Sequence, residues 1–185
     1  DLNTVSDIMM LGELVYKTIR DKYPEQKIYL APYPGTGDMF LIGMYLRERM
    51  QYDEIQECVL VSCLPSSKKI MDLFDLGDLI LENIVLQNQT EMDVLMFFTR
   101  GYGYDKANFS VMNDGFGLYE ILPFRGLRGL DFNSMFQRVV FRSRSKITKP
   151  ELCMKSADTL FEQNHLRKGK TILLSPYANT VTNLS

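Results

Sequence analysis

The residues best suited to chemistry in this chain lie in one turn near its start, Gly35-Thr36-Gly37-Asp38. A short apolar run, Ile28 to Ala31, precedes the turn, and a helical pattern follows it as far as Arg49. This order predicts a strand, a turn and a helix, the opening unit of an open α/β sheet whose ligands bind beyond the carboxyl ends of its strands. A carboxylate such as Asp38 at or near the N-cap satisfies free amides and suits the positive end of the helix dipole. Asp38 could therefore take a proton in a reaction, stand beside a bound phosphate, or only cap the helix.

The backbone of the same turn is a candidate anion site, because amides at the start of a helix attract negative charge. Gly35, Thr36 and Gly37 are the candidate anion-binding residues. The alternative is that the glycines only permit the positive φ of a tight turn. Two nucleotide-binding motifs are excluded: Phe40 occupies the place of the third glycine of a dinucleotide fingerprint, and no Gly-Lys-Ser/Thr follows.

Composition narrows the class of protein. The 185 residues are enough for one core, or for one domain and the beginning of another, and 45% hydrophobic with 24% charged residues is typical of globular domains. A net charge of −2 predicts no general affinity for nucleic acid. No apolar run is long enough to cross a bilayer, and the first residues do not resemble a secretory signal. We therefore expect a cytoplasmic protein.

Cysteine and histidine are scarce. The three cysteines are too few and too irregularly spaced for a disulfide framework or a zinc site. The single His, His165, leaves little material for a histidine-rich metal site or a Ser-His-Asp triad. We interpret Cys58, Cys63 and Cys153 as buried apolar residues in a reducing compartment, and we predict no metal site.

Apolar runs of strand length alternate with helical patterns through the first two thirds of the chain. This alternation predicts a Rossmann-like, doubly wound, mostly parallel sheet with helices on both faces. The expected strands after Ile28–Ala31 are Cys58–Cys63, Ile84–Leu86 and Phe109–Met112. The expected helices are one capped by Ser6, one entered at Asp38, a short one around Ile70, one from Thr90 to Gly101, and a later one from Asp131 to Val140.

Charge is unevenly distributed along the chain. Residues 124–149 hold seven basic side chains, Arg125 and Arg128 first among them, and a single acid, whereas residues 72–93 hold six acids and no Lys or Arg. The basic stretch could be a solvated helix and linker. It could also receive an anionic substrate or make peripheral contact with anionic lipid headgroups.

The last part of the chain predicts the beginning of a second domain. A helix is expected from Pro150 to about Arg167, then a buried strand over Thr171–Leu174 and a polar turn, with no helix to cover that strand before Ser185. We therefore expect one domain over residues 1–149, and over residues 150–185 a linker helix and the start of a second, truncated domain.

Two motifs together resemble the bacterial heptosyltransferase-type glycosyltransferases, which have the two-domain GT-B architecture. They are the strand with Gly-Thr-Gly-Asp near the start, and the late segment running from Lys149-Pro150-Glu151-Leu152 to Gly169-Lys170-Thr171-Ile172-Leu173-Leu174-Ser175-Pro176-Tyr177-Ala178-Asn179. Tyr177 departs from the family, which usually has Gly there. The likeness extends to the order of elements across nearly the whole chain.

The resemblance implies a role for each motif. Asp38 matches the family's catalytic base, which deprotonates the acceptor hydroxyl, and Ser175, Asn179 and Thr180 would meet the donor phosphate or merely form a turn. It also implies a nucleotide-sugar donor as substrate, a glycan or lipid-linked acceptor, and no further cofactor.

Two other functions stay open. One is a non-catalytic α/β interaction or regulatory domain, and the other is a different nucleotide-sugar enzyme such as an epimerase. Aromatic residues at Tyr102-Gly103-Tyr104 and from Phe116 to Tyr119 could stack on a sugar, although such side chains are more often part of a core.

Overall fold

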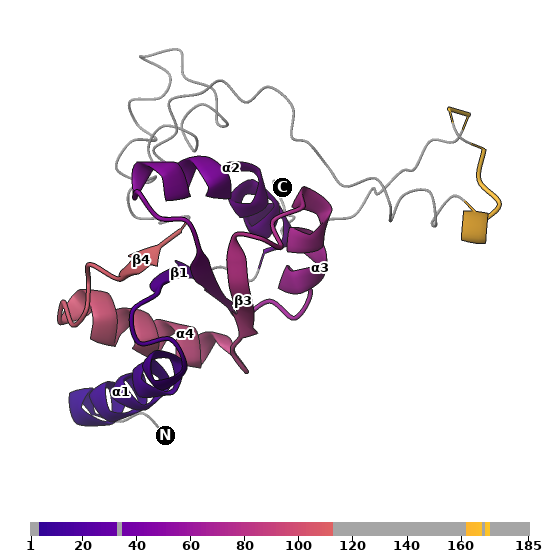
Figure 1. Ribbon diagram of the computed structural model, residues 1–185. Helices are drawn as coiled ribbons and strands as arrows, with labels where there is room; N and C mark the ends of the chain where they lie inside the picture. Colours follow the sequence, from indigo (N-terminus) through magenta and orange to yellow (C-terminus); the bar gives the residue numbers. More distant parts are fainter. Residues whose placement is uncertain (1–3, 33–34, 113–161, 168, 171–185) are drawn as a thin grey trace, which may run out of the picture. The chain divides into compact units, whose positions relative to one another are not determined.

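Strands and helices alternate along the described part of the chain, which is residues 4–32, 35–112, 162–167 and 169–170 of a computed structural model (Figure 1). The order begins with a helix and then repeats strand and helix until a last short strand. The elements are α1 (Val5–Lys22), β1 (Lys27–Ala31), α2 (Thr36–Tyr52), β2 (Cys58–Ser62), α3 (Ser67–Met71) with the 3₁₀ turn η1 (Asp72–Phe74), β3 (Ile80–Val85), α4 (Gln89–Met96) with the π-helical turn η2 (Phe97–Gly101), and β4 (Phe109–Val111).

The four strands form one parallel sheet in the order β3-β2-β1-β4. Leu30, in β1, pairs with Val61 of β2 on one side and with Val111 of β4 on the other. β2 is buried along its whole length, and so is β1 after its first residue, as expected for the inner strands of a parallel sheet. The predicted fold class is confirmed: the protein is α/β and Rossmann-like, with a parallel sheet.

Helices cover both faces of this sheet (Figure 1). Successive side chains of a strand point to opposite faces, so Tyr29 joins the apolar cluster under α2 and α3 while Ile28 and Leu30 join the cluster under α1 and α4. Each cluster is built from buried residues of the strands and of the two helices above it. Burial at about 25 cal/mol per Å² of apolar surface makes these two layers the main source of stability.

Two helices begin two residues earlier than predicted. Thr4, not Ser6, is the N-cap of α1, and Asn88, not Thr90, is the N-cap of α4. The Thr4 hydroxyl accepts a hydrogen bond from the Asp7 amide, while the Asp7 carboxylate accepts one from the Thr4 amide. A cap residue followed three residues later by an acid forms a capping box, and this pattern selects Thr4 over Ser6.

The third strand is longer than predicted, because β3 begins at Ile80 rather than Ile84 and ends at Val85. Glu82 and Asn83 interrupt its apolar pattern. A register shift opposite Cys58 and Val59 changes the alternation of inward and outward side chains in this edge strand. Glu82 accepts a hydrogen bond from Lys22 of α1.

The chain divides into two units, residues 1–152 and 153–185. In the second unit, residues 162–163 are helical and the chain turns at 164–165, where His165 has a φ of 52°. The predicted helix therefore does not continue to Arg167. The predicted helix over 131–140, the strand over 171–174 and the domain boundary at 149/150 lie outside the described residues.

Candidate functional site

The turn between β1 and α2 places Asp38 in the first turn of α2. Gly35 is the N-cap, Thr36 is the first helical residue, and Asp38 is the third. Thr36 and Gly37 are exposed, whereas Gly35 and Asp38 are half-buried. The prediction that Asp38 lies near the N-cap is confirmed, so its charge stands at the positive end of the α2 dipole.

The glycines of this turn are not explained by positive φ. Gly35 has φ −88° and ψ 132°, an extended conformation open to any residue, and Gly37 lies within the helix. In the described residues, positive φ occurs in glycine only at Gly103 and Gly169. The alternative interpretation from the sequence is therefore wrong for this turn.

Sheet topology places the turn at a ligand-binding edge. β1 is followed by α2 on one face, and β4, its neighbour on the other side, is reached through α4 on the opposite face. The strand order therefore reverses between β1 and β4, and crevices for ligands form outside the carboxyl ends of strands at such a point. Asp38 follows the carboxyl end of β1.

A glutamine ties the loops at this edge together. Gln89, the first residue of α4, donates through Nε2 to the carbonyl of Pro32 (2.8 Å) and to Oδ1 of Asp93 (2.9 Å). Its Oε1 accepts from the Cys63 thiol at 3.0 Å. One side chain thus connects the residues that follow β1, β2 and β3. The sequence did not indicate Gln89, because its contact with Pro32 spans 57 positions and matches no motif.

The two described cysteines are free and buried. Burial raises the pKa of Cys58 to about 12 and also raises the pKa of Cys63 above its ordinary value. Both therefore remain thiols at neutral pH, which makes them poor nucleophiles. The interpretation of Cys58 and Cys63 as buried residues is confirmed, and Cys153 lies outside the described residues.

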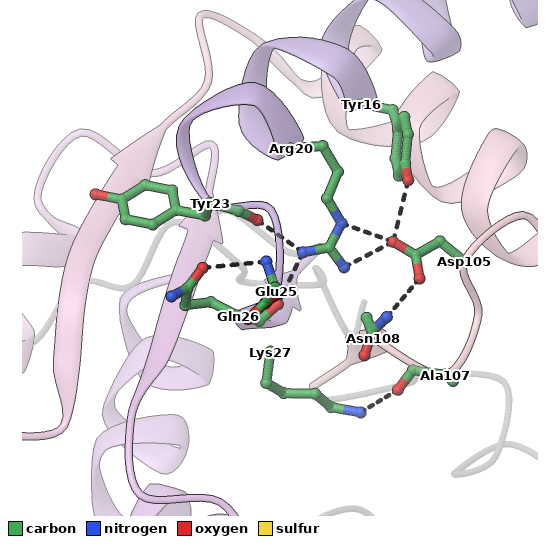
Figure 2. A network of polar contacts seen from close by, with 9 residues as sticks. All are labelled: Tyr16, Arg20, Tyr23, Glu25, Gln26, Lys27, Asp105, Ala107 and Asn108. Atoms are coloured by element: carbon green, nitrogen blue, oxygen red, sulfur yellow. Dashed lines mark hydrogen bonds and ion pairs between the residues drawn. The ribbon is translucent and has the colours of Figure 1, made fainter.

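A second polar cluster lies at the opposite, amino edge of the sheet (Figure 2). Arg20 of α1 is buried and contacts Oδ2 of Asp105 through Nε at 2.7 Å and Nη2 at 2.6 Å. Its Nη1 donates to the backbone carbonyls of Tyr23 and Gln26 at 2.8 and 2.9 Å. This geometry joins α1, the start of β1 and the loop before β4.

The carboxylate of this cluster is held in its charged form. Burial raises the pKa of Asp105, but hydrogen bonds from Arg20 and Asn108 outweigh burial and bring that pKa below its ordinary value. The Tyr16 hydroxyl donates a further hydrogen bond to Oδ2 at 3.1 Å. Since Asp105 has φ 57°, this cluster also holds a left-handed residue in place. We interpret it as a structural clamp, because protein donors already surround the carboxylate.

Five predicted site residues lie outside the described part of the chain: Arg125, Arg128, Ser175, Asn179 and Thr180. The basic stretch 124–149 lies outside it too. Of the residues that are described, no three of His, Cys, Asp or Glu gather as a metal site would require. Within the same residues, none of the helices combines the length and apolarity needed to cross a membrane.

Comparison with known proteins adds no relatives. No family model matches the chain, and neither a curated protein nor a solved structure is significantly similar to it.

Proposed function

We propose that the protein is a glycosyltransferase, or its amino-terminal domain, with Asp38 as general base. The transferred sugar comes from a nucleotide-sugar donor, and its acceptor is a hydroxyl of a cell-envelope glycan or a lipid-linked glycan. In this reaction Asp38 takes the proton of the acceptor hydroxyl, and the acceptor oxygen bonds to the anomeric carbon of the donor sugar. The bond from that carbon to the donor phosphate breaks, and the nucleotide leaves with the electron pair.

One observation carries the proposal: a half-buried carboxylate stands in the first turn of α2, directly beyond β1 at the point where the strand order reverses. Ligands of open α/β sheets bind at such points. Thr36 and Gly37 are exposed residues at the start of the same helix, where backbone amides suit an anionic group of a substrate. The resemblance of this strand and turn to the heptosyltransferase-type enzymes supports the choice of reaction.

The contacts of Pro32 and the place of Asp38 in α2 support a carboxylate that is held in a fixed position. Gln89 holds the carbonyl of Pro32, the residue that follows β1, and Asp38 lies within the first turn of α2. A general base works only if its oxygen is held within hydrogen-bond reach of the acceptor hydroxyl. The place of Asp38 within the first turn of α2 supports that restraint.

The test is a transfer assay on the full native protein. It is incubated with a panel of nucleotide sugars and with an envelope glycan extract, and released nucleotide and labelled glycan are both measured. Asp38→Asn keeps the size of the side chain and removes its basicity. We expect kcat to fall by on the order of 10²–10⁴-fold while the donor KM changes little.

Asp7→Asn is the matched control. Asp7 is the third residue of α1, as Asp38 is of α2, so both substitutions remove a negative charge from a helix start. If both variants lose activity together with melting temperature, Asp38 is a cap. Full transfer activity in a folded Asp38→Asn protein would refute the assignment of the base. If the wild-type protein binds no nucleotide sugar, the interaction-domain alternative replaces the enzyme.

A further inference from the structure

The N-cap of α2 is a glycine without a backbone reason to be one. Its φ of −88° and ψ of 132° are accessible to all residues. Helix N-caps favour Ser, Thr, Asn and Asp, whose side chains accept hydrogen bonds from amides of the first turn. The N-caps of α1 and α4, Thr4 and Asn88, follow this rule, and their side chains accept from Asp7 and Glu91 amides. Glycine is also accepted at an N-cap, and the structure adds a steric reason for it at position 35.

The space beside Gly35 is filled by Asp38. A β-carbon placed on Gly35 would lie closer than 3.0 Å to Oδ2 of Asp38 and 3.3 Å from its Cγ. The carboxylate therefore rests over the α-carbon of the N-cap glycine. Gly37, two residues later, is different, because a β-carbon placed there meets no atom within 4 Å. Of the two glycines in the turn, only Gly35 is sterically coupled to the carboxylate.

We propose that Gly35 is a positioning residue: the absence of its side chain lets the Asp38 carboxylate lie over its α-carbon, and this sets the direction in which the carboxylate meets the acceptor hydroxyl. The inference rests on the proposed function of Asp38 as a general base. It adds a specific residue to that function, namely the one that orients the base.

Substitution of Gly35 is compatible with folding. The atom that meets the new β-carbon is the far end of the Asp38 side chain, which can rotate away without a backbone shift. In α1 a Thr4 cap with its own β-carbon coexists with the third-position acid Asp7, whose Oδ2 then accepts from the Thr4 amide at 3.0 Å. We therefore expect a side chain at position 35 to move the carboxylate and to leave the helix folded.

The experiment compares Gly35→Ala, Gly35→Ser and Gly77→Ala in the full native protein. Gly35→Ser is the sharpest variant, since a serine is a better N-cap than alanine but still carries the β-carbon. We expect wild-type melting temperature for Gly35→Ser with a loss of kcat on the order of 10–100-fold, because displacement of a catalytic group by about 1 Å has an effect of that size. Gly77→Ala is the glycine control, because a β-carbon placed there also meets no atom within 4 Å, so its kcat should exceed that of both Gly35 variants by at least about tenfold.

Two further measurements separate the inference from the proposed function. The double variant Gly35→Ser/Asp38→Asn should lose no more kcat than Asp38→Asn alone, because a misplaced base and an absent base are the same defect. A crystal structure of Gly35→Ser should show the Asp38 side chain in a different rotamer from the wild type.

The outcomes are distinguishable. Loss of activity in Asp38→Asn with full kcat in both Gly35 variants would overturn the positioning role and leave the base intact. Full activity in Asp38→Asn would overturn the proposed function itself. An unchanged Asp38 rotamer in the Gly35→Ser crystal structure would overturn the positioning role without any reference to activity.

Discussion

Arg20 offers the clearest test of how this fold is held together. The change is Arg20→Met, which keeps most of the length of the side chain and removes the guanidinium. Arg20 and Asp105 are 9% and 16% exposed, so the substitution leaves a mostly buried carboxylate without its cation. It also removes the donor to the carbonyls of Tyr23 and Gln26.

Loss of one partner from a buried ion pair costs about 3–5 kcal/mol. We expect a value near the lower end, about 3 kcal/mol, since Asp105 keeps hydrogen bonds from Tyr16 and Asn108. That is a large part of a domain stability of about 5–15 kcal/mol. The free energy of unfolding is measured by urea titration followed by far-ultraviolet circular dichroism, with linear extrapolation to water.

Lys17→Met is the matched control on the same helix. Lys17 pairs with Glu13 on the surface, where the two side chains are 61% and 47% exposed, so little change in stability is expected. The double variant Arg20→Met/Asp105→Asn should be less destabilised than the sum of the single changes, because both remove one interaction, and Asn tolerates the left-handed backbone of position 105. If the free energies of unfolding of Arg20→Met and Lys17→Met differed by less than about 0.5 kcal/mol, the structural role of the Arg20–Asp105 pair would be refuted.

Three further predictions follow from described contacts. The pKa of Asp105 is lowered in the folded protein, so the stability that this carboxylate contributes is fully present above the unfolded pKa of about 3.9 and is lost as pH falls through the lowered folded value. In urea titrations, the free energy of unfolding of the wild type should exceed that of Asp105→Asn by a constant amount above about pH 5. This difference should shrink below about pH 4. Gln89→Ala should lower the free energy of unfolding by about 1–2 kcal/mol in a urea titration, whereas Gln87→Ala on the exposed surface should change it little. Equal values for the two variants would contradict the structural role of Gln89. Burial raises the pKa of Cys58 to about 12, so peptide mapping after iodoacetamide treatment at pH 8 should find it alkylated only in denaturant.

Central strands were predictable from sequence because burial on both faces leaves a continuous apolar run. β1 and β2 each lie within one residue of their predicted limits for this reason. β3 was predicted four residues too short at its start, because an edge strand can carry Glu82 and Asn83 when neighbouring helices supply their hydrogen bonds. The parallel arrangement followed from alternation of strands and helices alone.

Long-range polar contacts were not predictable. The bond from Gln89 to Pro32 spans 57 positions, and the Arg20–Asp105 pair spans 85. No local pattern indicates such pairs, since each residue type is ordinary at its own position and acquires a role only when the sheet brings the two together. The turn at Asp38 was found because its residues are adjacent, but the reason for Gly35 was not, since it depends on where a carboxylate lies in space.

The two edges of the sheet differ in what their carboxylates can do. At the amino edge Asp105 receives Arg20, Tyr16 and Asn108, and these donors occupy the sites through which a base would take a proton. At the carboxyl edge Asp38 is half-buried beside the exposed Thr36, in a helix turn that topology places where ligands bind. The donors around Asp105 lower its pKa, which makes it a weak base. A catalytic carboxylate needs access to substrate and a fixed direction. Gly35 bears on the second requirement, so substitution there should alter catalysis before stability, and substitutions at Arg20 should do the reverse.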